Sequence, residues 1–159
     1  MPTLAGAIGH PNCNAQPTTN QKEFFVRTSF HIHYKGQCEQ AFEYYAEVLG
    51  AEIGTMLRFC DSPAADSVPD TWRDKIVHAN LNLNGVEIAG DDTLPEQYKK
   101  PEGFYILLQF DDEESTKSAF ESLSDNGAVL LPIQKTFWSS CYGIVTDQFG
   151  VSWKLNCVS

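Results

Sequence analysis

The sequence predicts an α+β fold in which a βαβββ unit occurs twice within 159 residues. Three observations support this fold class. Apolar and polar residues alternate in several short segments, as they do in half-buried strands. Two other segments have apolar residues at helical spacing, and a glycine closes each of them. We expect the helices to cover one face of the sheet, so that the polar faces of the strands line a concave cavity.

The first unit is predicted to occupy residues 24–92. Its first strand is predicted at residues 24–34, where Phe30, Ile32 and Tyr34 share one face while His31 and His33 share the other. A helix of about 11 residues follows and ends before the glycine at position 50. The remaining elements are strands at residues 51–59, 75–83 and 86–89, a surface loop at 63–74 and an Asn84-Gly85 hairpin turn.

The second unit is predicted at residues 103–158 and repeats the same order of elements. Its helix begins in the acidic segment 111–114 and carries an apolar stripe of Ala119, Phe120 and Leu123. Its strands are predicted at residues 103–110, 128–134, 142–146 and 151–157. Residues 1–22 are rich in Pro, Gly, Asn, Gln and Thr, which predicts a flexible arm before a single domain at residues 23–159.

The composition argues against several classes of partner. Eleven basic and 21 acidic side chains give a formal charge of −10, which disfavours nucleic acid and anionic membrane surfaces. No apolar run approaches the roughly 20 residues that span a bilayer. The first 20 residues have no signal-peptide pattern, and the five cysteines are odd in number without a CxxC pair. We therefore expect a cytoplasmic protein with no nucleic-acid or membrane partner.

Several segments resemble the PhnB-like family, also labelled 3-demethylubiquinone 3-methyltransferase-like, of the glyoxalase/bleomycin resistance/dioxygenase (vicinal oxygen chelate) superfamily. The resemblance extends over about residues 29–156 and is carried by segments 36–39, 42–45, 49–52, 74–79, 95–98, 136–138 and 142–153. It implies two βαβββ modules that form a cupped, mostly antiparallel eight-stranded sheet, in a homodimer. The superfamily includes both enzymes and binding proteins, so the fold alone selects no reaction.

The resemblance also implies a position for a divalent metal ion. Metal-dependent members use a His or Glu from the first strand of each module and a Glu from the last strand. Here His31 or His33 is available in the first strand, but Lys154 stands where the last Glu is expected, and residues 103–108 offer no ligand. We therefore expect no metal cofactor. The alternative is a rearranged divalent-metal site of His31 or His33 with His78 and Glu87.

A second group of candidate residues precedes and follows the strand at 142–146. Segment 136–142 combines aromatic rings with hydroxyl groups, which suits either an organic ligand or packing in the core or at a dimer interface. Arg58 and Lys154 offer positive charge to a carboxylate or phosphonate, or else lie solvated at the surface. The candidate ligand-binding residues are His31, His33, Arg58, His78, Thr136, Trp138, Tyr142, Lys154 and Asn156.

Two functional hypotheses follow. The first is a metal-free protein that binds a small organic molecule in the polar cavity. The second is a metal-dependent lyase, isomerase or transferase that acts on a substrate with vicinal oxygens. Methyltransferase activity is not expected, because the sequence has no glycine-rich turn after its first strand. Cys141 is not expected to be a nucleophile, because no base is predicted beside it.

Overall fold

The computed structural model describes residues 26–158 of the chain. The first module contains β1 (Phe30–Tyr34), α1 (Cys38–Leu49), β2 (Glu52–Arg58), β3 (Ile76–Leu83) and β4 (Val86–Asp92). Its four strands form one sheet in the order β1-β4-β3-β2, in which β1 runs parallel to β4 and the other pairs are antiparallel. Three short 3₁₀ turns, Phe59–Asp61, Ala65–Ser67 and Asp70–Trp72, connect β2 to β3.

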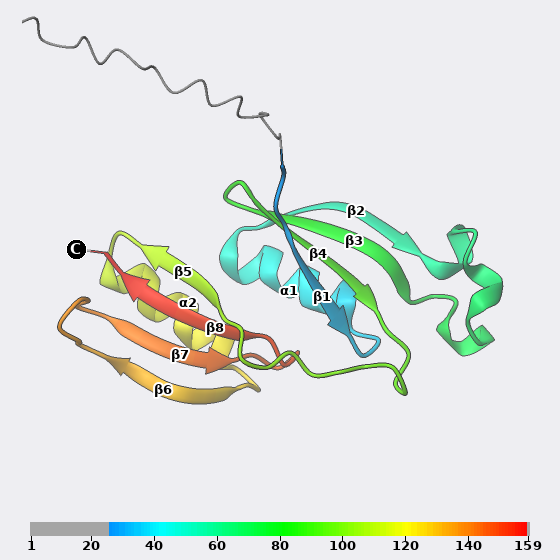
Figure 1. Ribbon diagram of the computed structural model, residues 1–159. Helices are drawn as coiled ribbons and strands as arrows, with labels where there is room; N and C mark the ends of the chain where they lie inside the picture. The colour runs from blue at the N-terminus through cyan, green and yellow to red at the C-terminus, as the bar shows by residue number, and fades with distance from the viewer. Residues whose placement is uncertain (1–25, 159) are drawn as a thin grey trace, which may run out of the picture.

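The second module repeats this topology. It contains β5 (Ile106–Phe110), α2 (Glu113–Ser124), β6 (Ala128–Gln134), β7 (Tyr142–Thr146) and β8 (Ser152–Cys157). The strand order is β5-β8-β7-β6, with β5 parallel to β8. The two modules lie side by side, and each helix lies against its own sheet (Figure 1). The predicted α+β class and the doubled βαβββ order are confirmed, with the eight strands divided between two mixed sheets of four.

Local sequence signals set the ends of several elements. The left-handed conformation of Gly50, with φ at 67°, ends α1, and the Asp112 carboxylate caps α2 by accepting from the Ser115 backbone N–H at 2.7 Å. Asn84 and Gly85 both have positive φ, as a tight hairpin turn between β3 and β4 requires. These residue types therefore have the conformations that the sequence predicted for them.

Each sheet has one buried face and one open face. In β1, Ile32 and Tyr34 are buried while His31 and His33 are exposed. The same alternation in β8 buries Trp153 and Leu155 under α2 and leaves Lys154 half-exposed. Because one face of each sheet is covered by a helix, the opposite polar face is the surface available for binding.

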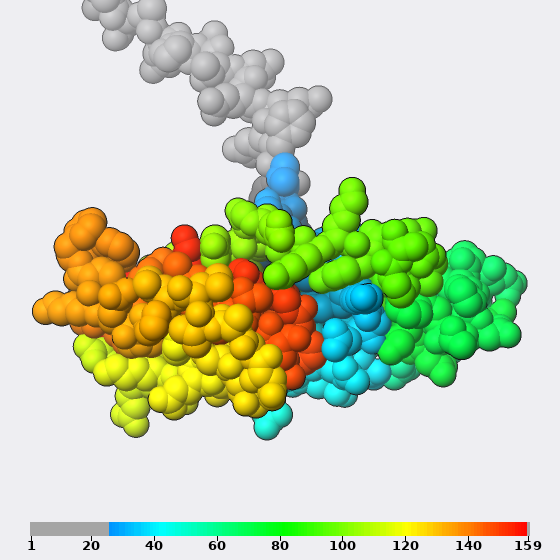
Figure 2. Space-filling model, turned by 90° about the horizontal axis from the view of Figure 1, so that it is seen from below, coloured from blue at the N-terminus to red at the C-terminus, as the bar shows by residue number. Residues whose placement is uncertain are grey.

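The two modules pack against each other through α1. The Tyr45 hydroxyl donates to the Asp147 carboxylate at 2.6 Å, and its ring meets that of Trp153 edge-on at 5.1 Å. The Tyr44 hydroxyl donates to the backbone carbonyl of Ser122 in α2. Figure 2 shows the resulting body, in which red segments of the second module lie directly beside blue and cyan segments of the first.

The observed boundaries differ from the predicted ones by more than one residue at three strands. β1 begins at Phe30 and β5 at Ile106, later than predicted, whereas β4 continues to Asp92 instead of ending at residue 89. The predicted arm at residues 1–22 lies outside the described residues. Within residues 26–158, no helix is long and apolar enough to cross a bilayer.

Candidate functional site

Four side chains on the open face of the first sheet form what we call the histidine cluster: His31, His33, His78 and Asp91. The Asp91 carboxylate lies within hydrogen-bonding distance of two imidazoles, at 3.0 Å from His31 Nε2 and 2.7 Å from His33 Nδ1. It also accepts from the Thr93 hydroxyl at 3.1 Å. The parallel β1/β4 pairing explains this arrangement, because it aligns His33 with Asp91 and places His31 on the same face, two residues earlier and opposite Ala89.

His78 reaches the cluster from β3. Its ring centroid lies 6.5 Å from that of His31, and the His31 and His33 rings are 5.2 Å apart. The side chains of His31 and His33 are 44% and 58% exposed, compared with 22% for Asp91. Two imidazoles therefore contact one carboxylate, the third lies next to His31, and all three histidines stay accessible to solvent and to small molecules.

Hydrogen bonding keeps the Asp91 carboxylate ionised. Burial alone would raise the pKa of Asp91, but the hydrogen bonds from His33 and His31 outweigh burial and lower this pKa below its usual range. Asp92, the next residue, faces the opposite side and has a structural role. It accepts from the backbone N–H groups of Cys38 and Ile76, both at 2.9 Å, and burial raises its pKa.

A hollow of about 560 Å³ lies next to the cluster. His33 and Asp91 form part of its wall, together with residues of the turns after β2 and of the segment after β4. Phe59, Val77 and Leu94 supply apolar surface to the same hollow. Organic ligands are commonly held in such places, where apolar walls surround a few polar groups.

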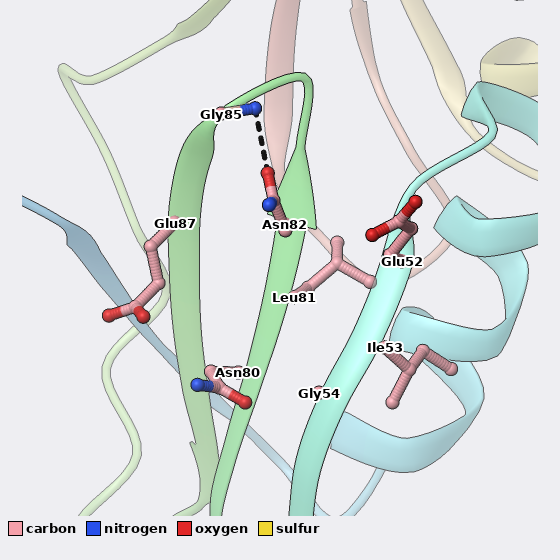
Figure 3. Close-up of a pocket in the computed structure, with 8 residues that line it drawn as sticks. All are labelled: Glu52, Ile53, Gly54, Asn80, Leu81, Asn82, Gly85 and Glu87. Carbon is pink, nitrogen blue, oxygen red and sulfur yellow. Dashed lines mark hydrogen bonds between the residues drawn. The ribbon is translucent and has the colours of Figure 1, made fainter.

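A second hollow, of about 400 Å³, lies toward the β3/β4 hairpin of the same sheet (Figure 3). Asn80, Asn82 and Glu87 project from β3 and β4 around it, as Figure 3 shows. The Asn80 side-chain oxygen accepts from the Thr55 backbone N–H at 2.5 Å. Glu87 of β4 lies directly opposite Asn82 of β3 in the strand pairing. Both side chains therefore line this hollow.

The open face of the second sheet has a different chemistry. Lys154 Nζ lies 4.5 Å from the centroid of the Tyr105 ring, and the rings of Trp138 and Tyr142 are 5.5 Å apart. The Asn156 side-chain oxygen is buried and has no hydrogen-bond partner among the described residues. Sequence reasoning expected His31, His33 and His78 to line one cavity together with Trp138, Lys154 and Asn156. The strand register places Tyr142, Lys154 and Asn156 on one face of the second sheet, whereas the three histidines lie on the first sheet.

The strand register gives residue-by-residue counterparts in the two sheets. β1 pairs with β4 from Phe30/Ile88 to Tyr34/Asp92, as β5 pairs with β8 from Ile106/Trp153 to Phe110/Cys157. The counterparts of the cluster residues His31, His33, His78 and Asp91 are therefore Leu107, Gln109, Tyr142 and Asn156. The first sheet has imidazoles and a carboxylate where the second has only neutral groups.

Other predicted residues have structural partners. Arg58 donates to the Glu39 carboxylate and to the Asp74 carbonyl, both at 2.6 Å, and so bridges α1 and the β2/β3 connection. Thr136 contacts the backbone of its own loop, at 3.4 Å from the Ser139 carbonyl. The ring of Phe137 is 96% exposed and therefore does not fill the core of this chain. Burial raises the pKa of the Cys141 thiol, which disfavours the reactive thiolate.

Sequence reasoning missed Asp91. The predicted fourth strand ended at residue 89, so the carboxylate at 91 was not assigned to a strand face. Glu87 and Asp91 are four residues apart, so in an extended strand their side chains point to the same face. Extending the predicted strand by two residues would have placed Asp91 on the open face. The parallel pairing of β1 with β4 joins segments almost 60 residues apart, and no local pattern specifies it.

Comparison with known proteins agrees with this architecture. The profile of the family described as 3-demethylubiquinone-9 3-methyltransferase matches residues 27–156. Protein YjdN of Escherichia coli (strain K12) is 34% identical, with 80% of this chain and 92% of that protein covered. The crystal structure of PA1353 from Pseudomonas aeruginosa is also 34% identical and has a TM-score of 0.76, covering 84% of this chain and 98% of the other.

Two further structures extend the likeness. The PhnB protein from Bacillus cereus has a TM-score of 0.72 at 23% identity, covering 84% of this chain and all of the other. The fosfomycin resistance protein FosX from Listeria monocytogenes shares the fold at 9% identity, with a TM-score of 0.60 and coverage of 86% and 96%. This chain therefore belongs to the family described as 3-demethylubiquinone-9 3-methyltransferase, and it has the α+β glyoxalase/bleomycin resistance fold.

Proposed function

We propose that this protein binds a small polar organic molecule on the open faces of its sheets. The observation that carries the proposal is the histidine cluster, which borders a hollow of about 560 Å³ on an otherwise uncovered face. Imidazoles can donate or accept hydrogen bonds near neutral pH, and they orient a ligand that brings several oxygens. Such a function needs no cofactor.

Lys154 narrows the chemical class of the ligand. It is a cation on the open face of the second sheet, and its ammonium lies 4.5 Å from the centroid of the Tyr105 ring, with no carboxylate partner among residues 26–158. An ammonium beside an aromatic ring suits a carboxylate or phosphonate group that carries an organic body. We propose a small carboxylic or phosphonic acid as the ligand.

A panel of small carboxylic and phosphonic acids, screened by ligand-observed NMR with the full chain, tests this function. We expect at least one acid to bind, and we expect both Lys154→Ala and His33→Ala to weaken its binding about tenfold or more, since His33 lines the hollow. Lys117→Ala is the matched control, because Lys117 pairs with Glu113 on the exposed side of α2. Failure of every acid in the panel, or equal weakening by the control, would contradict the proposal.

The family description names a methyltransferase, but the fold of this chain is not the one typical of nucleoside-dependent methyl transfer. Methyl transfer from a nucleoside-containing donor is typical of parallel sheets with a glycine-rich turn after the first strand. The described residues instead form two mixed sheets, and the turn after β1 contains the single glycine Gly36. We therefore base the proposed function on the open faces alone.

We further propose that two copies associate and that the protein works in the cytoplasm. Apolar side chains such as Leu107, Phe137 and Trp138 are 52%, 96% and 55% exposed, and a second copy would cover part of this surface. Light scattering should then give about twice the 17.7 kDa chain mass, and a monomer mass would contradict association. Cys38, Cys60, Cys141 and Cys157 are free thiols, which supports a reducing compartment.

Metal-assisted chemistry on vicinal oxygens is the second candidate function. The metal position implied by resemblance draws ligands from both modules, and the second module offers Leu107, Gln109 and Lys154 on the strands concerned. These side chains are not metal ligands of the required kind. A metal-dependent reaction in this protein would therefore need donors from the first module, and Asp91 makes such a set available.

A further inference from the structure

We propose that His31, His33 and Asp91 bind one divalent transition-metal ion, such as Zn²⁺ or Ni²⁺, entirely within the first module. The proposal goes beyond the ligand-binding function, which needs no metal. It also differs from the two-module arrangement, because all three donors come from two adjacent strands of one sheet, β1 and β4. The metal would keep open positions for an oxygen of the bound molecule.

The spacing of the donor atoms supports this site. The ligand atoms of His31, His33 and Asp91 all lie within 4.8 Å of one another, and each imidazole is 2.7–3.0 Å from a carboxylate oxygen. Zinc binds nitrogen and oxygen at about 2.0–2.2 Å, so neighbouring ligand atoms in such a site are roughly 3.0–3.5 Å apart. The two observed contacts need only a small expansion to admit an ion.

The donor types select the class of metal. Two imidazoles and one carboxylate suit zinc, nickel, iron or manganese, whereas calcium and magnesium favour sites built from oxygen alone. The imidazoles can act as ligands in the tautomer that carries its proton on the other ring nitrogen. Asp91 supplies the single negative charge, and its lone pairs then point to the ion instead of to two N–H groups.

The surroundings leave room for further ligands. His31 and His33 are about half exposed, and His33 and Asp91 also line the hollow of about 560 Å³. Three protein ligands with open positions are the arrangement found in catalytic zinc sites, whereas structural zinc sites have four. A bound molecule in the hollow could therefore reach the ion directly with an oxygen atom.

Hydrogen bonding alone is a weak reason for the cluster. Ion pairs between exposed side chains contribute little to stability, so three such groups do not need to gather for folding. The second sheet demonstrates the same point, because it forms with Leu107, Gln109 and Asn156 at the counterpart positions. A sheet of this topology therefore folds with glutamine at the position of His33 and asparagine at the position of Asp91, so these two substitutions are suitable for a test.

Calorimetric titration of the full chain with Zn²⁺ alone, repeated with Ni²⁺, tests the site. Cys13→Ser and Cys60→Ser are carried throughout to remove thiols that could bind the ions. We expect one equivalent to bind, and we expect His33→Gln and Asp91→Asn each to weaken binding at least about tenfold. Both substitutions introduce the counterpart residue of the second sheet, and circular dichroism verifies that each variant folds.

The controls separate this site from its competitors. His78→Ala and Glu87→Gln should leave metal affinity unchanged, because neither residue belongs to the group of three. Loss of binding in these two variants, with retention in His33→Gln and Asp91→Asn, would overturn the proposal in favour of a His31, His78 and Glu87 site. Absence of stoichiometric binding would also overturn it. Acid binding measured with a chelator present tests the ligand-binding function separately.

Discussion

The two modules share one topology and one strand register, yet their open faces differ in kind. The first sheet presents three imidazoles and a carboxylate, and the second presents Leu107, Gln109, Tyr142 and Asn156 at the counterpart positions. The helix-covered faces, by contrast, are apolar in both modules. The repeated unit therefore determines how the chain packs, while the open face of each copy carries its own chemistry.

The largest expected effect tests whether the modules depend on each other. The buried carboxylate of Asp147 accepts from the Tyr45 hydroxyl, the Trp153 indole N–H and the backbone N–H groups of Phe149 and Val151, at 2.6–3.0 Å. Asp147→Ala leaves these buried donors unpaired and should lower the free energy of unfolding by at least about 3 kcal/mol. Urea unfolding followed by circular dichroism measures the change.

The same variant, Asp147→Ala, tests whether the first module folds independently of the second. Tyr45 belongs to α1, so we expect the loss to extend to the first module, seen as one cooperative transition for both halves. Asp111→Ala removes an exposed carboxylate and serves as the control with little effect. Two separate transitions, with the histidine NMR signals of the first module unchanged, would show that the modules are independent.

The next prediction compares the cost of adding a methyl group on the helix-covered faces with the cost on the open face. A Cβ atom at Gly143 would lie 2.7 Å from the Phe120 ring under α2, and one at Gly90 would lie 2.9 Å from the Phe42 ring under α1. Gly143→Ala and Gly90→Ala should each cost about 1–3 kcal/mol through overpacking, measured by thermal or urea unfolding. Gly54→Ala meets Asn80 on the open face, where that side chain can turn aside, so its cost should be smaller.

A smaller effect concerns pH. Burial raises the pKa of Asp147 above its usual value, although the hydrogen bonds from Tyr45 and Trp153 oppose the shift. A raised folded-state pKa adds stability at pH below the unfolded-state pKa of about 3.9, and this contribution is lost as pH rises through the folded-state pKa. The free energy of unfolding of the wild type relative to Asp147→Asn should therefore be greater at pH 4 than at pH 7. The opposite slope would show that hydrogen bonding outweighs burial.

The smallest effect concerns the aromatic loop of the second module. Phe137 is 96% exposed, and its ring meets that of Trp138 edge-on at 4.4 Å. Phe137→Ala should therefore change the free energy of unfolding by less than about 0.5 kcal/mol at low protein concentration. A larger loss that grows with protein concentration would place this ring in an interface between two copies.

Most of the fold could be predicted because its signals are local. Alternation assigned the strand faces of His31 and His33, and Gly50 and Asn84-Gly85 marked ends of elements that the structure confirms. The candidate site was harder to predict. His33 and Asp91 meet through a parallel strand pair that no short pattern encodes. The ion pair of Arg58 with Glu39 similarly depends on how α1 and β2 pack, which periodicity does not reveal.

The central proposal is that His31, His33 and Asp91, on the open face of the first sheet, hold one divalent metal ion. Anomalous diffraction at the zinc absorption edge, from crystals of the full chain soaked in Zn²⁺, tests it most directly. We expect one strong peak among His31 Nε2, His33 Nδ1 and the Asp91 carboxylate. A peak beside Glu87 and His78, a peak on the second sheet near Asn156, or no ordered zinc would contradict the claim.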